Sequence, residues 1–350
     1  MDKPDIKSML PGELSELLKS CGQPAYRAGQ IFTWLHKGVA SFDEMTNIPV
    51  DLRNMLKENA YFFPPIVKKR LVSGIDSTVK YLYELYDGQA VESVLMSYLH
   101  GNTVCVSSQA GCRMGCTFCA STIGGCERNL FASEMLDQVL FTQKDSGRKI
   151  GNVVLMGIGE PLDNYDNVLR FLNLLSHKDG MNLSLRHVSL STCGLVDRIR
   201  QLAQERLQLT LSISLHAPDD KIRSQLMPVN RKWGIDELLD ACREYIALTG
   251  RRISFEYAMI AGVNDSDACA AALAARLRGM LCHVNLIPAN DVRERGFKRS
   301  GALRIKKFSE ILEKGGLSCT VRRTLGSDIN ASCGQLRRAH LEEGGNRLED

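Results

Sequence analysis

The chain has 350 residues, of which 44% are hydrophobic and 24% charged, and its formal net charge is +4. These values are typical of a globular protein that can bury a sizeable core. No stretch approaches the roughly 18 uninterrupted apolar residues of a membrane helix, and the first residues lack the apolar core of a signal peptide. We therefore expect a cytoplasmic protein without membrane contact.

The N-terminal part is predicted to contain mainly short helices. Apolar residues recur at helical spacing in two segments, 11–21 and 27–37. Residues 79–86 alternate as a strand does, and the preceding segment 72–77 supplies turn residues. We expect residues 1–87 to form a small, mostly helical accessory domain.

From about residue 88 onwards, strand and helix patterns alternate along the chain. The predicted strands are 103–107, 152–156, 187–191, 209–215, 253–260, 282–287 and 318–322. The predicted helices are 134–144, 167–177, 196–204, 235–248, 267–278 and 302–314. Such alternation indicates parallel strands joined by right-handed crossovers, and six units are too few for a closed eight-stranded barrel. We predict an α/β fold with a partial (β/α)6 barrel over residues 88–323, in preference to a doubly wound sheet, and a C-terminal extension over 324–350.

Polar motifs follow several of these strands directly. They are 112–119, 157–161, 191–194, 214–216 and 288–290. In both candidate architectures ligands bind at the carboxyl ends of the strands. We therefore expect the five motifs to converge on one rim of the sheet.

The first motif contains Cys112, Cys116 and Cys119, spaced C-x3-C-x2-C. Iron-sulfur clusters and structural zinc ions usually take four protein ligands, so three thiolates leave one metal position open. The site is either an iron-sulfur cluster with an open iron or a zinc site completed by Cys105 or Cys126. The twelve cysteines are too scattered for a secreted disulfide framework.

The cysteine loop resembles that of the radical S-adenosylmethionine (SAM) superfamily, in which three cysteines hold a [4Fe-4S] cluster and the open iron binds SAM. The motif Gly-Ile-Gly-Glu-Pro at 157–161 lacks the third glycine of a dinucleotide-binding loop and alone would be a turn. Beside the cysteine loop it resembles the element that receives the amino group of SAM. The resemblance implies that SAM is bound by Gly159, Glu160, Ser191, Ser214, Leu215, His216 and Asn290.

Further segments resemble the RlmN/Cfr family of radical SAM RNA adenine methyltransferases. They surround Glu92, Cys105, residues 226–230, residues 262–265 and Cys333, so the resemblance covers almost the whole chain. It implies methylation of adenosine at C2, at adenosine 2503 of 23S ribosomal RNA and adenosine 37 of some transfer RNAs. A [4Fe-4S] cluster and two SAM molecules per turnover would be needed.

The same resemblance implies roles for three residues outside the cysteine loop. Cys333 would carry the methyl group as S-methylcysteine. Cys105 would resolve the RNA adduct through a transient disulfide with Cys333. Glu92 would accept the proton from C2, a suitable task for a carboxylate.

The resemblance also suggests partners: 23S ribosomal RNA and transfer RNA, and an external electron donor such as flavodoxin or ferredoxin. We expect a monomer. Residues 292–323 contain ten Lys and Arg and three Glu, a local charge of +7. Together with the N-terminal domain, this segment is expected to bind structured RNA, although a solvated helix face is the plain alternative.

Three other functions are consistent with parts of the sequence. Methylation at C8 of the same adenosine would use the same cysteines, but the segments 157–164 and 296–300 resemble the C2 branch. An RNA-binding protein with a structural zinc site would leave Cys333 without a role. A radical-activating enzyme acting on a protein partner would not need the pair Cys105 and Cys333.

Overall fold

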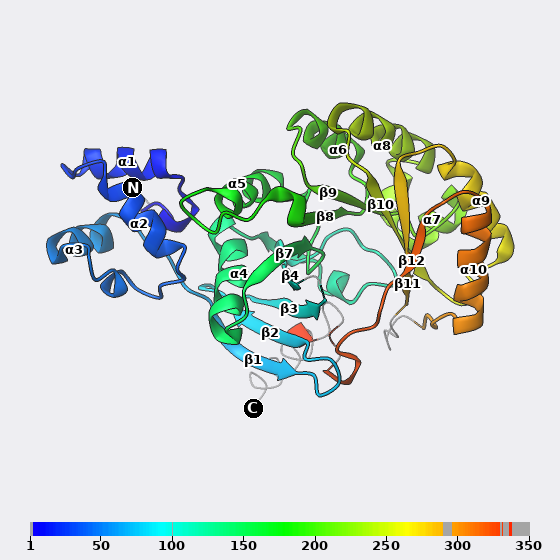
Figure 1. The fold of residues 1–350 in the computed structure, drawn as a ribbon, viewed down its shortest axis with the longest axis horizontal. Helices are drawn as coiled ribbons and strands as arrows, with labels where there is room; N and C mark the ends of the chain where they lie inside the picture. The colour runs from blue at the N-terminus through cyan, green and yellow to red at the C-terminus, as the bar shows by residue number, and fades with distance from the viewer. Residues whose placement is uncertain (1–2, 100, 290–295, 330, 332–335, 338–350) are drawn as a thin grey trace.

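The computed structural model describes residues 3–99, 101–289, 296–329, 331 and 336–337. A ten-stranded sheet curves through the molecule (Figure 1). Its strands, in spatial order, are β1 (Ile66–Val72), β2 (Val79–Glu84), β3 (Ala90–Tyr98), β4 (Gly101–Cys105), β7 (Ile150–Leu155), β8 (Val188–Thr192), β9 (Thr210–Ser214), β10 (Ile253–Met259), β11 (Cys282–Pro288) and β12 (Cys319–Val321).

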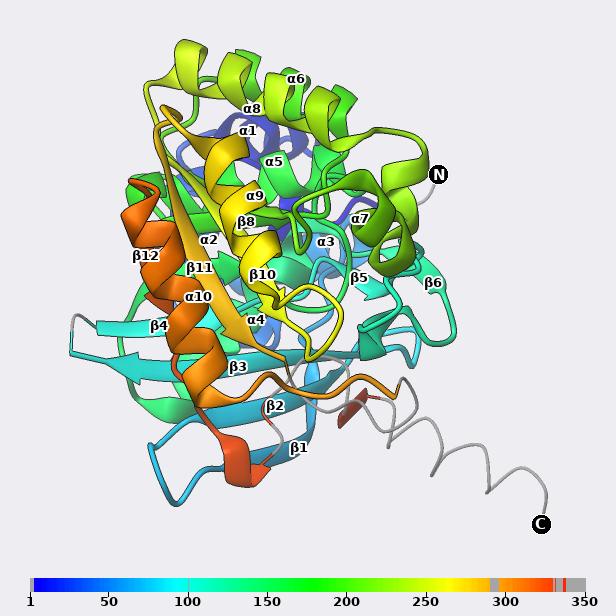
Figure 2. The same cartoon turned by 90° about the vertical axis from the view of Figure 1, so that its right-hand side faces the viewer.

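The parallel half of this sheet confirms the predicted partial barrel. Strands β4 and β7 to β12 run parallel to one another, and the sheet ends at β1 and β12 without closing. Helices follow the strands and cover the outer face of the curved sheet (Figure 2). They are α4 (Ala132–Ser146), α5 (Tyr165–Ser176), α6 (Val196–Gln204), α8 (Ile235–Thr249), α9 (Asp267–Leu277) and α10 (Ala302–Lys314).

The strand predicted over residues 79–86 is present as β2, whereas several other elements were not predicted from the sequence. β1 and β3 form antiparallel pairs with β2, and β3 also pairs with β4, so these strands extend the sheet beyond β4. A two-stranded sheet of β5 (Gln109–Gly111) and β6 (Cys126–Asn129) flanks the cysteine loop, and α7 (Asp220–Leu226) follows β9. The division of the chain at residue 87 stays a prediction; β1 and β2 precede it yet belong to the same sheet as the later strands.

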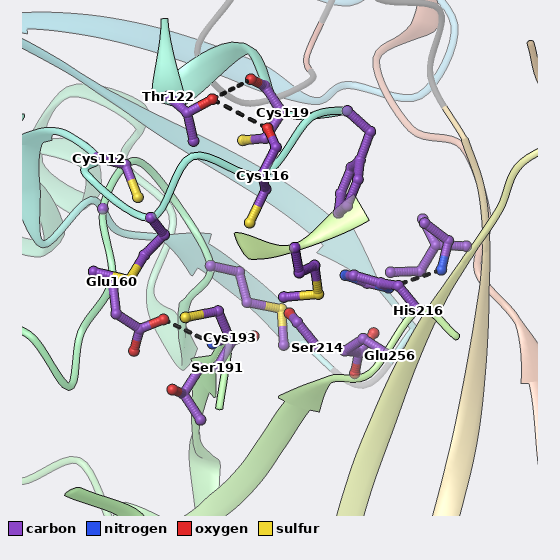
Figure 3. Close-up of a pocket in the computed structure, with 18 of the residues that line it drawn as sticks. Cys112, Cys116, Cys119, Thr122, Glu160, Ser191, Cys193, Ser214, His216 and Glu256 are labelled. Atoms are coloured by element: carbon purple, nitrogen blue, oxygen red, sulfur yellow. Dashed lines mark hydrogen bonds between the residues drawn. The ribbon is translucent and has the colours of Figure 1, made fainter. Parts of the chain in front are cut away.

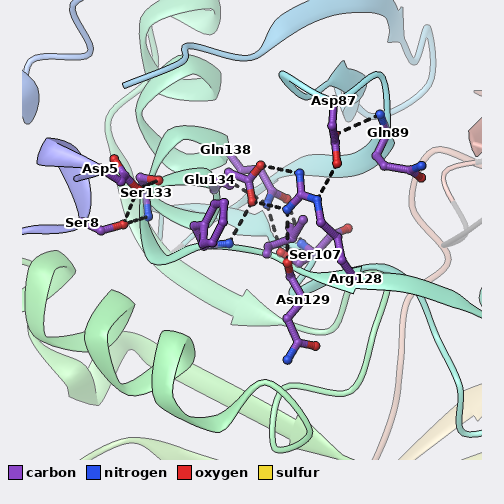
Figure 4. Close-up of polar contacts among 12 residues, drawn as sticks. Asp5, Ser8, Asp87, Gln89, Ser107, Arg128, Asn129, Ser133, Glu134 and Gln138 are labelled. Atoms are coloured by element: carbon purple, nitrogen blue, oxygen red, sulfur yellow. Dashed lines mark hydrogen bonds and ion pairs between the residues drawn. The ribbon is translucent and has the colours of Figure 1, made fainter. Parts of the chain in front are cut away.

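The N-terminal helices α1 (Pro11–Ser20), α2 (Arg27–Leu35) and α3 (Val50–Asn59) lie at one side of the barrel (Figure 1). Polar contacts join this module to α4: Ser133 bonds to Ser8 at 3.0 Å and to Asp5 at 2.5 Å (Figure 4). The buried Lys7 and Asp137 side chains also form an ion pair. Losing one partner of such a pair costs about 3–5 kcal/mol, so this junction fixes the module on the barrel.

The strand β6 is fixed to the sheet by Arg128. Its guanidinium lies 2.5 Å from an Asp87 carboxylate oxygen and donates two bonds of 2.7 Å to Glu134 (Figure 4). Asp87 lies in the turn between β2 and β3, and Glu134 lies in α4. This single side chain therefore ties the antiparallel extension, the β5–β6 pair and the first barrel helix together.

The C-terminal segment packs on the β1–β2 hairpin. The Gly326 amide donates to Asp76 at 2.8 Å, and Asp328 accepts from Ser73 at 2.7 Å and from the Gly74 amide at 2.9 Å. Farther along, Leu336 is buried in a small cluster against β2 and β3. No helix in the described part of the chain has the length and apolar character needed to cross a membrane.

Candidate active site

A cavity of about 300 Å³ lies at the carboxyl ends of the parallel strands (Figure 3). All five predicted motifs contribute to its lining, the fifth through Ala289 alone. Among the lining residues are Cys112, Cys116, Cys119, Gly159, Glu160, Ser191, Ser214 and His216. The expected convergence of the motifs on one rim is therefore found in the structure.

The cysteine loop is held in a fixed shape by local hydrogen bonds. Thr122 donates to the carbonyls of Cys116 and Cys119 at 3.1 and 2.9 Å, and the Thr117 amide donates to Leu226 at the end of α7 at 2.9 Å. The three cysteine side chains lie at the same wall of the cavity (Figure 3). The loop thus presents three sulfur donors to one space.

The chemistry of these thiols suits a cluster. Burial raises the pKa of the Cys112 thiol to about 12 and raises that of Cys116 as well. Without metal both would stay protonated, and a bound metal would displace the protons and stabilise the thiolates. Cys112, Cys116 and Cys119 would hold a four-iron cluster through their thiolates.

Two glycines bring the Gly157–Pro161 turn against the preceding strands. A Cβ atom at position 157 would lie 2.7 Å from the Val106 carbonyl, and at position 159, where φ is +107°, it would lie 2.6 Å from Gln109. Only glycine fits such a close approach at a positive φ. The packing fixes the next residue, since the Glu160 amide donates to the Gln109 side chain at 2.8 Å.

The Glu160 carboxylate is buried, with 3% of its surface exposed. Burial raises its pKa, and hydrogen bonds from the Cys193 amide at 2.7 Å and the Leu162 amide at 3.0 Å oppose this rise. Figure 3 shows the side chain at the floor of the cavity beside Cys193. A fixed buried carboxylate at this point can receive an ammonium group.

His216 lies on the opposite wall in an uncommon backbone conformation, with φ of 57°. Its Nδ1 accepts a hydrogen bond from the Ala258 amide at 3.0 Å, and its ring meets Phe118 edge-on at 5.0 Å. Burial lowers its pKa to about 3, so the ring is neutral at physiological pH. Leu215 is buried and does not line the cavity, whereas Asn290 lies outside the described residues.

Three lining or supporting residues were not singled out from the sequence, although one of them, Cys193, lies within the predicted motif 191–194. Arg223 is fully buried and donates to the Cys193 and Ser214 carbonyls at 2.6 and 3.3 Å, which holds two strand ends together. Cys193 and Glu256 line the cavity directly, and burial raises the pKa of both. A signal for Arg223 was its partner Asn230, at 2.9 Å, which belongs to a segment already singled out.

Glu92 lies on β3, outside the cavity lining, and is 3% exposed. Its Oε2 is 3.0 Å from the ammonium of the fully buried Lys80, and its Oε1 accepts the Arg337 amide at 2.6 Å. The Arg337 guanidinium donates at 3.0 Å to the Ala90 carbonyl. The C-terminal segment therefore contacts the carboxylate of Glu92, which the family resemblance had indicated as a site residue.

Cys105 is buried at the end of β4 in a cluster with Val94 and Met96. Met156, which also lines the cavity, and Ala331, from the C-terminal segment, pack against this cluster. Cys333 lies outside the described residues, but Ala331 is only two residues away in sequence. The neighbourhood of Cys105 thus adjoins both the cavity and the segment that leads to Cys333.

Comparison with known proteins identifies the family. Residues 106–274 match the model described as "Radical SAM superfamily", and residues 5–62 match "Ribosomal RNA large subunit methyltransferase N-terminal domain". The "Probable dual-specificity RNA methyltransferase RlmN" of Alkaliphilus oremlandii is 52% identical over 342 residues, covering 98% of this chain and 100% of that protein. The chain belongs to the RlmN family of radical SAM methyltransferases.

Two further comparisons agree with this assignment. The relative of the same name from Clostridium tetani is 54% identical over 317 residues, covering 91% of each chain. The crystal structure of a radical SAM methyltransferase from Sphaerobacter thermophilus matches with a TM-score of 0.91 at 44% identity, covering 95% of this chain and 98% of that chain. The predicted fold class and family are confirmed, and membership of the superfamily implies a [4Fe-4S] cluster and SAM. The donor set on the cysteine loop fits that cluster.

Proposed function

We propose that this enzyme methylates C2 of adenosine in RNA. C2 of adenine is electron-poor and has no lone pair, so an ordinary polar methyl transfer from SAM finds no nucleophile there. A cluster held by Cys112, Cys116 and Cys119 would supply, with SAM, the radical that this carbon requires. The observation that carries the proposal is the arrangement of a three-thiol loop and the buried Glu160 in one cavity.

The remaining steps are assigned to side chains of this chain. The sulfur of Cys333 takes a methyl group from one SAM by displacement, and a second SAM is consumed in activating that methyl group. The activated carbon then bonds to adenine C2, which links the RNA to Cys333 through the methylene carbon. Glu92 accepts the C2 proton.

Cys105 releases the RNA from this adduct. Its thiolate attacks the sulfur of Cys333, so that a disulfide forms while the sulfur–carbon bond breaks. The carbon keeps its new bond to adenine and takes up a proton to become the methyl group, and the unpaired electron of the adduct would pass to the cluster. An external reductant such as flavodoxin or ferredoxin returns both sulfurs to thiols. The packing of Ala331 near Cys105 supports this pairing.

The RNA substrates are proposed from the relatives. Their name specifies a dual-specificity RNA methyltransferase, and the N-terminal family model refers to large-subunit ribosomal RNA. We infer that this enzyme acts as a cytoplasmic monomer on 23S ribosomal RNA and on transfer RNA, at adenosines corresponding to those of the family. SAM would be bound by the residues predicted for it, of which Gly159, Glu160, Ser191, Ser214 and His216 line the cavity.

The test is anaerobic turnover of the reconstituted protein with SAM, reductant and an RNA fragment, followed by mass spectrometry of the nucleosides. We expect 2-methyladenosine. Formation of 8-methyladenosine alone would assign the enzyme to the C8 branch, and absence of product with iron and SAM bound would contradict the proposal. A Cys333→Ala variant should form no product and carry no methyl group.

A further inference from the structure

A second cavity adjoins the cysteine cavity at the ends of the last two strands. Its volume is about 500 Å³, and it is bordered by α10 and by residues at the ends of β11 and β12. These three elements lie side by side (Figure 2). Arg322 lines both cavities, so this residue lies where they adjoin.

The basic segment that the sequence singled out divides into two groups around α10. Arg304 and Lys307 face α9, where each lies 2.6 Å from a carboxylate oxygen of Asp267. Arg299 and Lys306 line the second cavity together with Arg322. On the α9 side the Asp267 carboxylate therefore engages both cations and offsets one of their two charges, whereas the cavity cations border a space that a ligand can enter.

The charge of the cavity is also uneven along α10. Glu310 and Glu313 line it one and two turns beyond Lys306, toward the C-terminal end of the helix. Lys306 and Glu310 are 3.9 Å apart and mostly exposed, so their interaction is weak. Within the described residues, neither Arg299 nor Arg322 forms an ion pair within 4.0 Å, and the Arg322 charge also acts on Glu256 in the cysteine cavity. The three cations Arg299, Lys306 and Arg322 outnumber the two carboxylates that line the second cavity.

We propose that this cavity binds a phosphate of the RNA backbone beside the nucleotide whose adenine enters the cysteine cavity. Arginine presents a planar set of donors that matches phosphate oxygens, and lysine adds a point charge. An adenine can reach a buried site only when it leaves its stack, and the flanking phosphates must then be held outside. Contacts to phosphate position the strand without reading its sequence. The proposal rests on RNA being the substrate.

The test compares two double variants that each remove two positive charges from the same segment. Arg299→Gln with Lys306→Gln removes the cavity cations, and Arg304→Gln with Lys307→Gln is the matched control. Affinity for an RNA hairpin with an unpaired loop adenosine is measured by fluorescence anisotropy over a range of salt concentrations. We expect the cavity variant to bind at least about 10-fold more weakly, and the slope of log K against log salt to fall by about 1 to 2. The control should stay within about 2-fold of the unaltered protein.

Enzymatic measurements separate this site from the reaction. The cavity variant should raise the KM for RNA, while SAM cleavage in the absence of RNA keeps the rate of the unaltered protein. Equal losses in both variants would show a general effect of charge and overturn the proposal, as would unchanged binding of the cavity variant. If the unaltered protein made no methyladenosine but the two variants still differed in RNA binding, the proposed reaction would fail and the phosphate site would stand.

Discussion

The ammonium of Lys80 lies 3.0 Å from Oε2 of Glu92, and both side chains are almost completely buried. Lys80 lies on β2 and Glu92 on β3, so the pair joins two neighbouring antiparallel strands. The other carboxylate oxygen, Oε1, faces the C-terminal segment and accepts the Arg337 amide. Lys80 therefore compensates the buried charge, and the oxygen turned toward the C-terminal segment is the one that would serve the role proposed for Glu92.

The proposed role of Glu92 as the base predicts that Lys80→Met impairs the proton-accepting step. Lys80 is the cation against the buried Glu92 carboxylate, and losing one partner of a buried ion pair disturbs the other. General-base catalysis contributes about 10²- to 10⁴-fold, so we expect RNA methylation to fall about 100-fold. SAM cleavage should change by less than about 2-fold. The rate of methyladenosine formation and the yield of 5'-deoxyadenosine measure the two effects.

Two controls distinguish this role from a loss of folding. Lys80→Arg keeps the charge and should restore much of the activity. Lys80→Met combined with Glu92→Gln removes the unpaired charge, so it should regain thermal stability but not methylation. An equal loss of SAM cleavage and methylation in Lys80→Met would contradict the assignment.

The contacts of Asp328 predict a second effect on the C-terminal segment. Asp328→Ala removes the acceptor for Ser73 and for the Gly74 amide, five residues before Cys333. The segment should then approach Cys105 less often. We expect disulfide formation between Cys105 and Cys333 under mild oxidation to slow several-fold, measured by mass spectrometry of the linked peptides. Asp240→Ala, which removes an exposed i,i+3 partner of Arg243, is the control and should leave the rate unchanged.

The barrel was predictable from the sequence, whereas the strands before it were less so. From β4 onwards, apolar strands alternate with amphipathic helices, and both α6 and α10 have the predicted ends. β3 was missed because seven consecutive residues from Ala90 are buried, so it shows no alternation, and its buried Glu92 resembles a surface residue in sequence. Only the pairing with Lys80 across β2 and β3 makes that carboxylate compatible with a core.

The candidate site was also only partly predictable from the sequence. Cys112, Glu160 and His216 follow strands directly, so the rule for parallel sheets placed them on one rim before their geometry was known. Arg223 supports that rim from α7, a helix of seven residues that the sequence pattern did not predict. Its role depends on three-dimensional contacts with carbonyls of β9 and of the residue after β8, and the sequence points to it only indirectly, through its partner Asn230 in the segment 226–230.

The cysteine loop gives a third prediction, which separates a cluster from a zinc site. Cys126 pairs with Gly111 beside the loop but does not line the cavity. Cys112→Ala should lose most of the iron, acid-labile sulfide and brown colour of the reconstituted protein. Cys126→Ala should retain all three. The zinc alternative predicts a different result. If the unaltered protein held zinc in place of iron and both variants lost it, a structural zinc site with Cys126 as the fourth ligand would be supported.

A fourth prediction concerns stability toward acid. His36 is buried in the N-terminal module, its ring packs 4.2 Å from that of Phe32, and neither ring nitrogen has a hydrogen-bond partner among the described residues. Burial lowers its pKa to about 3, with Lys7 and His177 as further positive neighbours. An unfolded histidine has a pKa of about 6.5. Between these values the unfolded chain binds a proton that the folded chain does not, so this stabilisation is complete above pH 6.5 and is lost as the pH falls toward 3.

The size of this pH effect follows from the two pKa values. When the pH falls from 7.5 to 5.5, proton uptake by His36 in the unfolded chain lowers the free energy of unfolding by about 1.4 kcal/mol. Urea denaturation of the metal-free protein at the two pH values measures this difference. His36→Leu should reduce the difference by about 1.4 kcal/mol, because leucine fills the apolar site without a titratable group. His187→Leu, at an exposed position, should leave it unchanged; equal pH dependence in His36→Leu and the unaltered protein would show that another group causes the acid sensitivity.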